Sequence, residues 1–136
     1  MHILTNNGAK QMNTATQTAG ILAQDPKHYS IQDLKLIVEE ARAAAYVSAT
    51  KHMDTHGEHA YCGFAWVSIY GVKGNTKLGK NLKAAGVEQT WDKSYQIWNP
   101  SGLGTQCMST KEAGAEAAAE VFTKYGFRSY AGSRAD

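Results

Sequence analysis

The apolar run from Cys62 to Val72 constrains the fold more than any other part of this sequence. The run includes Phe64, Trp66 and Ile69, and its apolar residues do not recur at the 3.6-residue period of a helix. A continuous apolar run of this kind is typical of a β-strand that is buried in a sheet. The chain must therefore build a sheet and supply other elements to cover it.

The other apolar residues indicate what covers that sheet. Leu, Ile, Val and Phe number 22 among 136 residues, a low content that would suggest disorder if the net charge were high, but the net charge is only +2. Most of the remaining apolar content is 20 alanines together with Trp and Tyr. We expect alanine-faced helices that pack closely against a sheet rich in Trp and Tyr, within one domain of ordinary size.

Apolar spacing and capping residues predict three helices. Ser30 followed by Asp33 is typical of a helix N-terminus, and Ser109 followed by Glu112 has the spacing of a capping box. The second helix carries lysines on one side and apolar residues on the other. The predicted helices cover residues 31–52, 77–85, with Gly86 as the stop, and 109–125.

Two further segments complete the predicted sheet. Residues 95–98 and 105–108 flank Asn-Pro-Ser-Gly at 99–102, which suits a type I turn, so we expect a hairpin there. A last short strand is expected at residues 127–131. After the first helix the order is strand, helix, strand, strand, helix, strand, as in the ferredoxin-like fold. The prediction is therefore an α+β fold with an antiparallel sheet, preceded by a long N-terminal helix.

One face of such a sheet has no helix of its own. In the ferredoxin-like fold both crossover helices cover the same face, and here the first helix could cover the other. If it does not, the face with Phe64, Trp66 and Tyr70, or the face with Val67 and Ile69, must meet a partner or a ligand. We expect a homo-oligomer, most simply a two-fold dimer, because flat apolar surfaces of this kind favour self-association.

The N-terminal part of the chain differs from the rest. Residues 5–20 contain no aromatic and no branched aliphatic residue, so residues 1–26 are predicted to be a mobile arm and residues 27–136 a single domain. The first residues lack the basic start and apolar core of a secretion signal, and no apolar run is long enough to span a bilayer. We expect a cytoplasmic protein without membrane contact, in which Cys62 and Cys107 are small apolar strand residues that stay reduced. The alternatives are a disulfide, which requires the two strands to be neighbours, and a catalytic thiol.

Basic residues cluster after the apolar run. A stripe of lysines on a short helix can contact phosphates, with exposed Trp and Tyr adding stacking, although a solvated helix face is the simpler alternative. The spacing Gly-x-x-x-x-Gly-Lys at residues 74–80 fits a phosphate loop, but Asn81 stands where that loop needs Ser or Thr. We interpret that segment as a glycine-containing loop before a helix. The candidate nucleic-acid-binding residues are Lys73, Lys77, Lys80 and Lys83.

A second set of side chains suggests a different chemistry. His52, His56, His59 and Cys62 are spaced so that two imidazoles share a helix face and a further His and Cys complete a tetrahedral zinc site. This alternative is a small metal-dependent or thiol enzyme, but the spacing matches no recognised zinc pattern and a solvated loop is simpler. Near the end of the chain, Arg134 could hold an anionic ligand, unless the terminus is frayed.

Several short motifs resemble a set of small uncharacterised proteins of tailed bacteriophages. These motifs are Cys-Gly-Phe-Ala-Trp-Val at 62–67, the lysine-rich helix, Lys-Glu-Ala at 111–113 and the ending Ser-Arg-Ala-Asp at 133–136. The likeness covers residues 62–136 and implies a phage protein that acts in the cytoplasm of an infected bacterium. The leading hypothesis is a non-enzymatic accessory protein without a cofactor, which binds nucleic acid or a host or phage protein.

Overall fold

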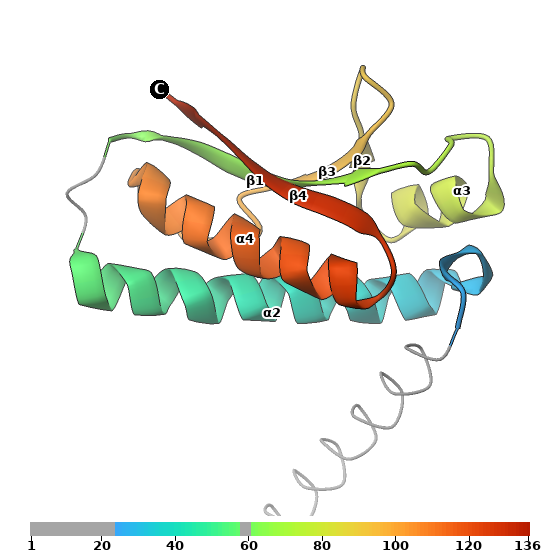
Figure 1. The fold of residues 1–136 in the computed structure, drawn as a ribbon, viewed down its shortest axis with the longest axis horizontal. Helices are drawn as coiled ribbons and strands as arrows, with labels where there is room; N and C mark the ends of the chain where they lie inside the picture. Colours follow the sequence, from blue (N-terminus) through green and yellow to red (C-terminus); the bar gives the residue numbers. More distant parts are fainter. Residues whose placement is uncertain (1–23, 58–60) are drawn as a thin grey trace, which may run out of the picture.

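The computed structural model describes residues 24–57 and 61–136, so most of the predicted arm lies outside the described residues. Figure 1 shows the sheet as one layer, with the helices on one side of it. A 3-10 turn, η1 (Pro26–His28), precedes the main elements. In chain order these are α2 (Ile31–His56), β1 (Gly63–Tyr70), α3 (Lys77–Ala84), β2 (Glu88–Gln89), β3 (Tyr95–Trp98), α4 (Met108–Lys124) and β4 (Arg128–Ala135).

The four strands form one antiparallel sheet in the order β2-β3-β1-β4. β1 is an inner strand: it pairs with β3, where Trp66 lies opposite Trp98, and with β4 over its whole length, from Gly63 to Tyr70. The predicted α+β class, the antiparallel sheet and the long N-terminal helix are confirmed. None of the helices in the described part of the chain is long and apolar enough to cross a membrane.

The predicted hairpin between residues 95–98 and 105–108 is wrong. β3 forms at the expected place, but it pairs with β2, and residues 105–108 contribute only an isolated bridge between Cys62 and Cys107. The turn after β3 does form, since Gly102 N donates to Asn99 O at 2.9 Å. Ser101 within this turn is buried and lies against Gly114 of α4, so packing carries the chain away from the sheet.

Other predicted element ends also differ. α2 runs to His56 rather than to about residue 52, because the helix continues until Gly57, at φ 70°, ends it. α4 begins at Met108 with Cys107 as a cap that makes no side-chain hydrogen bond, so the predicted capping box of Ser109 is wrong. Met108 N donates to Tyr61 O at 2.8 Å, and this bond starts the helix before Ser109 can cap it. The last strand runs to Ala135 rather than residue 131, because β1 offers it a hydrogen-bonding partner along its full length.

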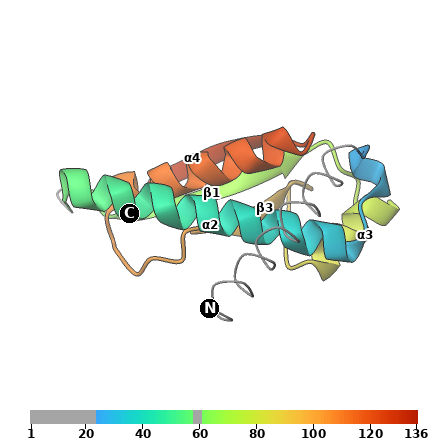
Figure 2. The same cartoon turned by 90° about the horizontal axis from the view of Figure 1, so that it is seen from below.

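The core lies between the helices and one face of the sheet. Seen from below, α2 and α4 lie side by side (Figure 2), and their alanine faces meet closely. Gly114 allows this approach, because a Cβ there would lie 3.3 Å from Ala45 O on α2. The Tyr29 hydroxyl donates to Tyr125 O at 2.8 Å and fixes the start of the domain to the end of α4. Buried side chains at the core include Leu34, Ile37, Ala41, Ala45, Val67, Ile69, Ile97, Ala115, Ala118 and Phe122.

α2 therefore does not cover the second face of the sheet. It packs against α4, on the same side as α3 (Figure 1). Within the described residues, no helix or strand lies over the opposite face.

Candidate functional site

The uncovered face of the sheet carries large aromatic side chains and arginines, and is called the aromatic face below. Directly opposed residues of antiparallel strands point to the same side, so the strand register determines which residues share this face. They are Phe64, Trp66, Ser68 and Tyr70 of β1, Gln96 and Trp98 of β3, and Arg128, Tyr130, Gly132 and Arg134 of β4.

The rings on the aromatic face contact one another. The centroids of Trp66 and Trp98 are 4.9 Å apart, and Phe64 meets Trp98 edge-on at 6.1 Å. Tyr70 and Tyr130 form a second pair at 5.9 Å. Trp98 is 46% exposed and Tyr130 58% exposed, so these rings are held in place and still reach solvent.

Gly132 explains how the Trp66 ring is held. A Cβ at this position would lie 2.5 Å from Trp66 Nε1 and 2.6 Å from Cε2, so the indole lies directly over the β4 backbone. Any larger residue at position 132 would displace the indole. Gly132 is thus required by the side chain opposite it rather than by its own backbone angles.

Positive charge flanks the rings at both ends of β4. The Arg134 guanidinium lies 5.6 Å from the Phe64 ring centroid, and that of Arg128 lies 5.6 Å from the Tyr70 centroid. Lys111 reaches Phe64 from α4: its Nζ lies 5.4 Å from the ring centroid and donates to Gly63 O at 2.9 Å. These distances suit cation–π interactions, which orient the cations while leaving the exposed arginines free to meet an anion.

The centre of the aromatic face is polar. Gln96 Nε2 donates to Ser68 Oγ at 3.2 Å, and Ser68 is buried between the neighbouring side chains. At the β2 edge, Glu88 lies opposite Gln96 and is exposed. Among the described strand residues on this face, the charged ones are therefore Glu88 and the two arginines.

Further cations surround the end of the face near Arg128. A pocket of about 280 Å³ is lined there by Lys73, Lys93, Arg128 and Asp92, among others. Hydrogen bonds from Thr90, and then from Ser94, hold the pKa of the Asp92 carboxyl below its ordinary value, so Asp92 is ionised at neutral pH. Three cationic side chains and one carboxylate thus line the same pocket at this end of the sheet.

The four predicted lysines do not form one surface with the aromatic face. All are exposed, but Lys77, Lys80 and Lys83 belong to α3, on the helical side of the sheet (Figure 1). Lys73 alone of the four lines the pocket beside Arg128. The basic helix and the aromatic face are separate features of the molecule.

The Gly-Lys spacing before α3 serves packing. Thr76 caps the helix by accepting a hydrogen bond from Gly79 N at 3.1 Å. A Cβ on Gly79 would lie 2.3 Å from Lys73 O and 2.6 Å from the Tyr95 hydroxyl. Gly79 is needed because α3 contacts both the preceding chain and β3 at this position. This packing role supports the interpretation of residues 74–80 as a loop before a helix.

The histidine set is only partly described. His52 and His56 lie on one side of α2 with ring centroids 4.6 Å apart, and His52 Nε2 lies 3.2 Å from Ser109 Oγ. His59 lies outside the described residues, and Cys62 is exposed. Residues 24–57 and 61–136 contain no group of three or more His, Cys, Asp and Glu side chains that could hold a metal ion. The zinc site stays a prediction.

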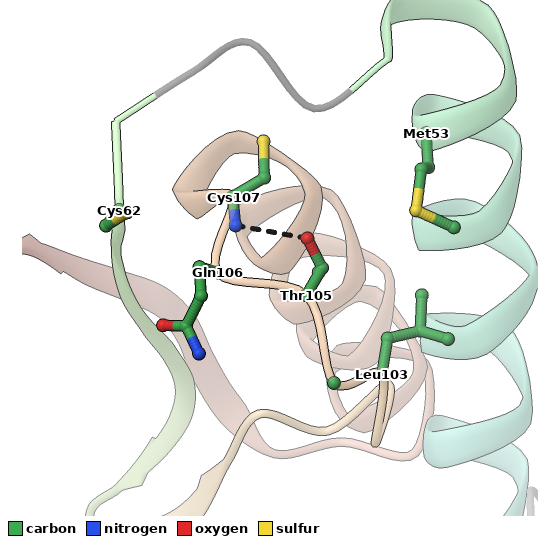
Figure 3. Close-up of a pocket in the computed structure, with 7 residues that line it drawn as sticks. Met53, Cys62, Leu103, Thr105, Gln106 and Cys107 are labelled. Atoms are coloured by element: carbon green, nitrogen blue, oxygen red, sulfur yellow. Dashed lines mark hydrogen bonds between the residues drawn. The ribbon is translucent and has the colours of Figure 1, made fainter.

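Cys62 lies beside a different set of residues. It lines a pocket of about 530 Å³ together with Met53, Leu103, Thr105 and Cys107 (Figure 3). Cys107 N donates to Thr105 Oγ1 at 3.1 Å, and Cys107 Sγ lies 3.3 Å from Ser109 Oγ.

No protein-family model matches this chain, and comparison with curated proteins and with solved structures finds no match. The candidate site therefore stands on its own geometry.

The β4 side of the aromatic face was missed by the sequence-based predictions, apart from Arg134. A signal for it exists, because Arg128, Tyr130, Gly132 and Arg134 alternate along the chain with the period of a strand. The structure places Arg134 within β4, opposite Phe64.

Proposed function

We propose that this protein binds single-stranded nucleic acid on the aromatic face and is not an enzyme. Bases stack on Trp66 and Trp98, and phosphates are held by Arg128 and Arg134. One observation carries this proposal: the ring centroids of Trp66 and Trp98 lie 4.9 Å apart on an uncovered face of the sheet. The guanidinium groups of Arg128 and Arg134 flank this pair at the two ends of β4.

The side-chain chemistry favours nucleic acid over a purely apolar partner. Stacking of bases on aromatic residues tolerates every base and contributes about 1–3 kcal/mol per base. Guanidinium groups bind phosphate in a bidentate manner and are more weakly hydrated than an ammonium group. Four-stranded sheets with exposed aromatic residues are one of the known platforms for single-stranded RNA. The ferredoxin-like arrangement expected from the sequence is part of this proposal, because it leaves one sheet face for a ligand.

The dimensions of the face suit a short segment of a single strand. Arg128 and Arg134 are six residues apart in β4, which is about 20 Å at the rise of a β-strand. That span accommodates about four nucleotides, the lower end of the site sizes known for stacking platforms. A duplex does not present base faces to the rings, so we expect single strands to bind more tightly than duplexes.

The loop between β2 and β3 extends this surface. In Figure 1 it stands above the sheet, on the side away from the helices. It contains Trp91, which is 94% exposed. We propose that Trp91 contributes a further stacking position at the edge of the aromatic face.

The proposed cellular setting rests on the short sequence motifs in residues 62–136 that resemble those of small phage proteins. We propose that binding takes place in the cytoplasm of an infected bacterium, as a phage accessory function.

The test is a fluorescence-anisotropy titration with labelled single strands of DNA and RNA of about 12 nucleotides, and with a duplex of equal length. Trp98→Ala is expected to weaken single-strand binding by about 5- to 150-fold, the equivalent of one lost stacking contact. Tyr46→Ala is the matched control, since Tyr46 is also about half exposed, at 52%, but lies on α2.

Charge is tested separately. Replacing both Arg128 and Arg134 with Ala should reduce the slope of log affinity against log salt by about 1.4, or about 0.7 for each lost phosphate contact. Reversing Lys77, Lys80 and Lys83 to Glu should have a smaller effect than the arginine pair. If only the lysine reversal abolishes binding, the basic helix is the site. If no oligonucleotide binds and Trp98→Ala instead converts a dimer to a monomer, the aromatic face is an interface between two copies of this chain.

A further inference from the structure

Cys62 and Cys107 are directly opposed in an antiparallel bridge that joins the start of β1 to the start of α4. Met108 N donates to Tyr61 O at 2.8 Å, and Gly63 N donates to Gln106 O at 3.2 Å. These two bonds flank the cysteines, so the cysteines themselves form a non-hydrogen-bonded pair. In such a pair the Cα atoms are about 4.5 Å apart and both side chains leave the same side of the ladder.

This pairing meets the main geometric requirement of a disulfide, a Cα separation of about 4.4–6.8 Å. Neither cysteine is in a disulfide, and both residues line the same pocket of about 530 Å³ (Figure 3). Closure requires the Cys107 side chain to leave its contact with Ser109 Oγ and rotate towards Cys62. Cys62 is exposed, whereas Cys107 is 4% exposed.

We propose that Cys62 and Cys107 are a redox-modification site that closes to an intramolecular disulfide when it meets an oxidised low-molecular-weight disulfide such as oxidised glutathione. The difference in exposure assigns an order to the steps. The Cys62 thiolate attacks one sulfur of oxidised glutathione, a mixed disulfide forms and one glutathione thiolate leaves. The Cys107 thiolate then attacks Cys62 Sγ and displaces the second glutathione. The two thiol protons pass to the two departing thiolates, so two protein thiols are oxidised while one glutathione disulfide is reduced to two thiols.

Closure changes what holds the domain together. The bond encloses residues 62–107, which include β1, α3, β2 and β3, and it links them to α4. A cross-link that closes a long loop restricts the unfolded chain and raises the stability of the folded one. This inference does not depend on nucleic-acid binding, since the cysteine pair lies at the start of β1 and outside the aromatic face.

The test uses the full-length protein, reduced and then equilibrated with glutathione buffers of increasing oxidised fraction, in the presence of a chelator. Intact mass after alkylation should show the loss of two hydrogen atoms, with both cysteines protected from alkylation. Peptide mapping of the unsubstituted protein should identify a Cys62–Cys107 link within one chain. The melting temperature should rise on oxidation and return on reduction, and neither Cys62→Ser nor Cys107→Ser should show the rise.

Two outcomes would overturn the proposal. One is a stable single glutathione adduct on Cys62 with Cys107 still open to alkylation after unfolding. The other is a disulfide between the Cys62 residues of two chains. Both are read from the unsubstituted protein, so the proposal stays testable even if a serine variant fails to fold.

Discussion

The two faces of the same sheet differ in what covers them and in the residues they use. On the inner face, Ala65, Val67 and Ile69 of β1 are each about 1% exposed and meet the helices. On the outer face, Phe64, Trp66 and Tyr70 of the same strand are only partly buried, although they are larger. Small aliphatic residues let helices approach closely, whereas large rings expose apolar area at a cost of about 25 cal/mol per Å². An exposed aromatic surface of this kind indicates a ligand or partner.

Ile69→Ala is expected to have the largest effect on stability and tests the inner face. Removing a fully buried aliphatic side chain should lower the free energy of unfolding by about 2–5 kcal/mol, measured by urea denaturation. Oligonucleotide affinity should be unchanged at temperatures where the variant is still folded. A loss below about 1 kcal/mol would mean that the core does not depend on this face as described.

Gly132→Ala is expected to affect both the stability of the protein and its binding through the outer face. The new Cβ collides with the Trp66 indole, so a destabilisation of about 1–3 kcal/mol should accompany a shift in tryptophan emission. Oligonucleotide affinity should fall because the Trp66–Trp98 pair is displaced. The matched control is Gly104→Ala, since nothing lies within 4 Å of a Cβ at Gly104. An unshifted emission spectrum in Gly132→Ala would contradict the placement of Trp66 over β4.

Arg134→Lys sharpens the description of the outer face. The substitution retains the charge but removes the planar group that lies over Phe64 and binds phosphate in a bidentate manner. We expect a fall in single-strand affinity of about three- to tenfold, with a free energy of unfolding within about 0.5 kcal/mol of the original. Equal affinity for the Lys and Arg proteins would show that Arg134 acts only as a point charge.

Asp92→Asn is expected to have the smallest effect and concerns the loop that stands above the outer face. Hydrogen bonds from Thr90 and Ser94 lower the pKa of Asp92 in the folded protein below its ordinary value near 3.8. The stabilisation by its charge is therefore complete above that value and is lost as the pH falls through the lowered folded pKa. The melting temperature of the unsubstituted protein should exceed that of Asp92→Asn at pH 7, and the difference should vanish in acid. A difference in melting temperature that grows in acid would contradict the lowered pKa of Asp92.

Local signals predicted the helices well. Ser30 does cap α2, where its side chain and that of Asp33 each accept a hydrogen bond from the other's backbone. These signals depend on residues a few positions apart, which the sequence displays directly. The same kind of signal was misleading at Ser109, because the bond from Met108 N to Tyr61 O depends on a segment far away in the chain.

Strand pairing was predicted less well. Glu88 and Gln89 have no strand-like character, and they become β2 only because β3 lies beside them. Ala131, Gly132 and Ser133 likewise have weak strand propensity and extend β4 because β1 offers a partner. The aromatic face needs both β3 and β4 to pair with β1, which explains why only its β1 residues and Arg134 stood out in the sequence.

The amino-acid sequence by itself determined the helical segments, the central strand, the close approach of alanine-faced helices and the α+β class, because each depends on local periodicity and residue size. The tertiary structure decided which face of the sheet stays open. It also decided that Arg134 meets Phe64, that Gly132 lies under Trp66 and that Cys62 faces Cys107. These contacts depend on the register between strands and on the side of the sheet to which α2 packs. Both are set by residues far apart in the chain, so no short stretch of sequence determines them.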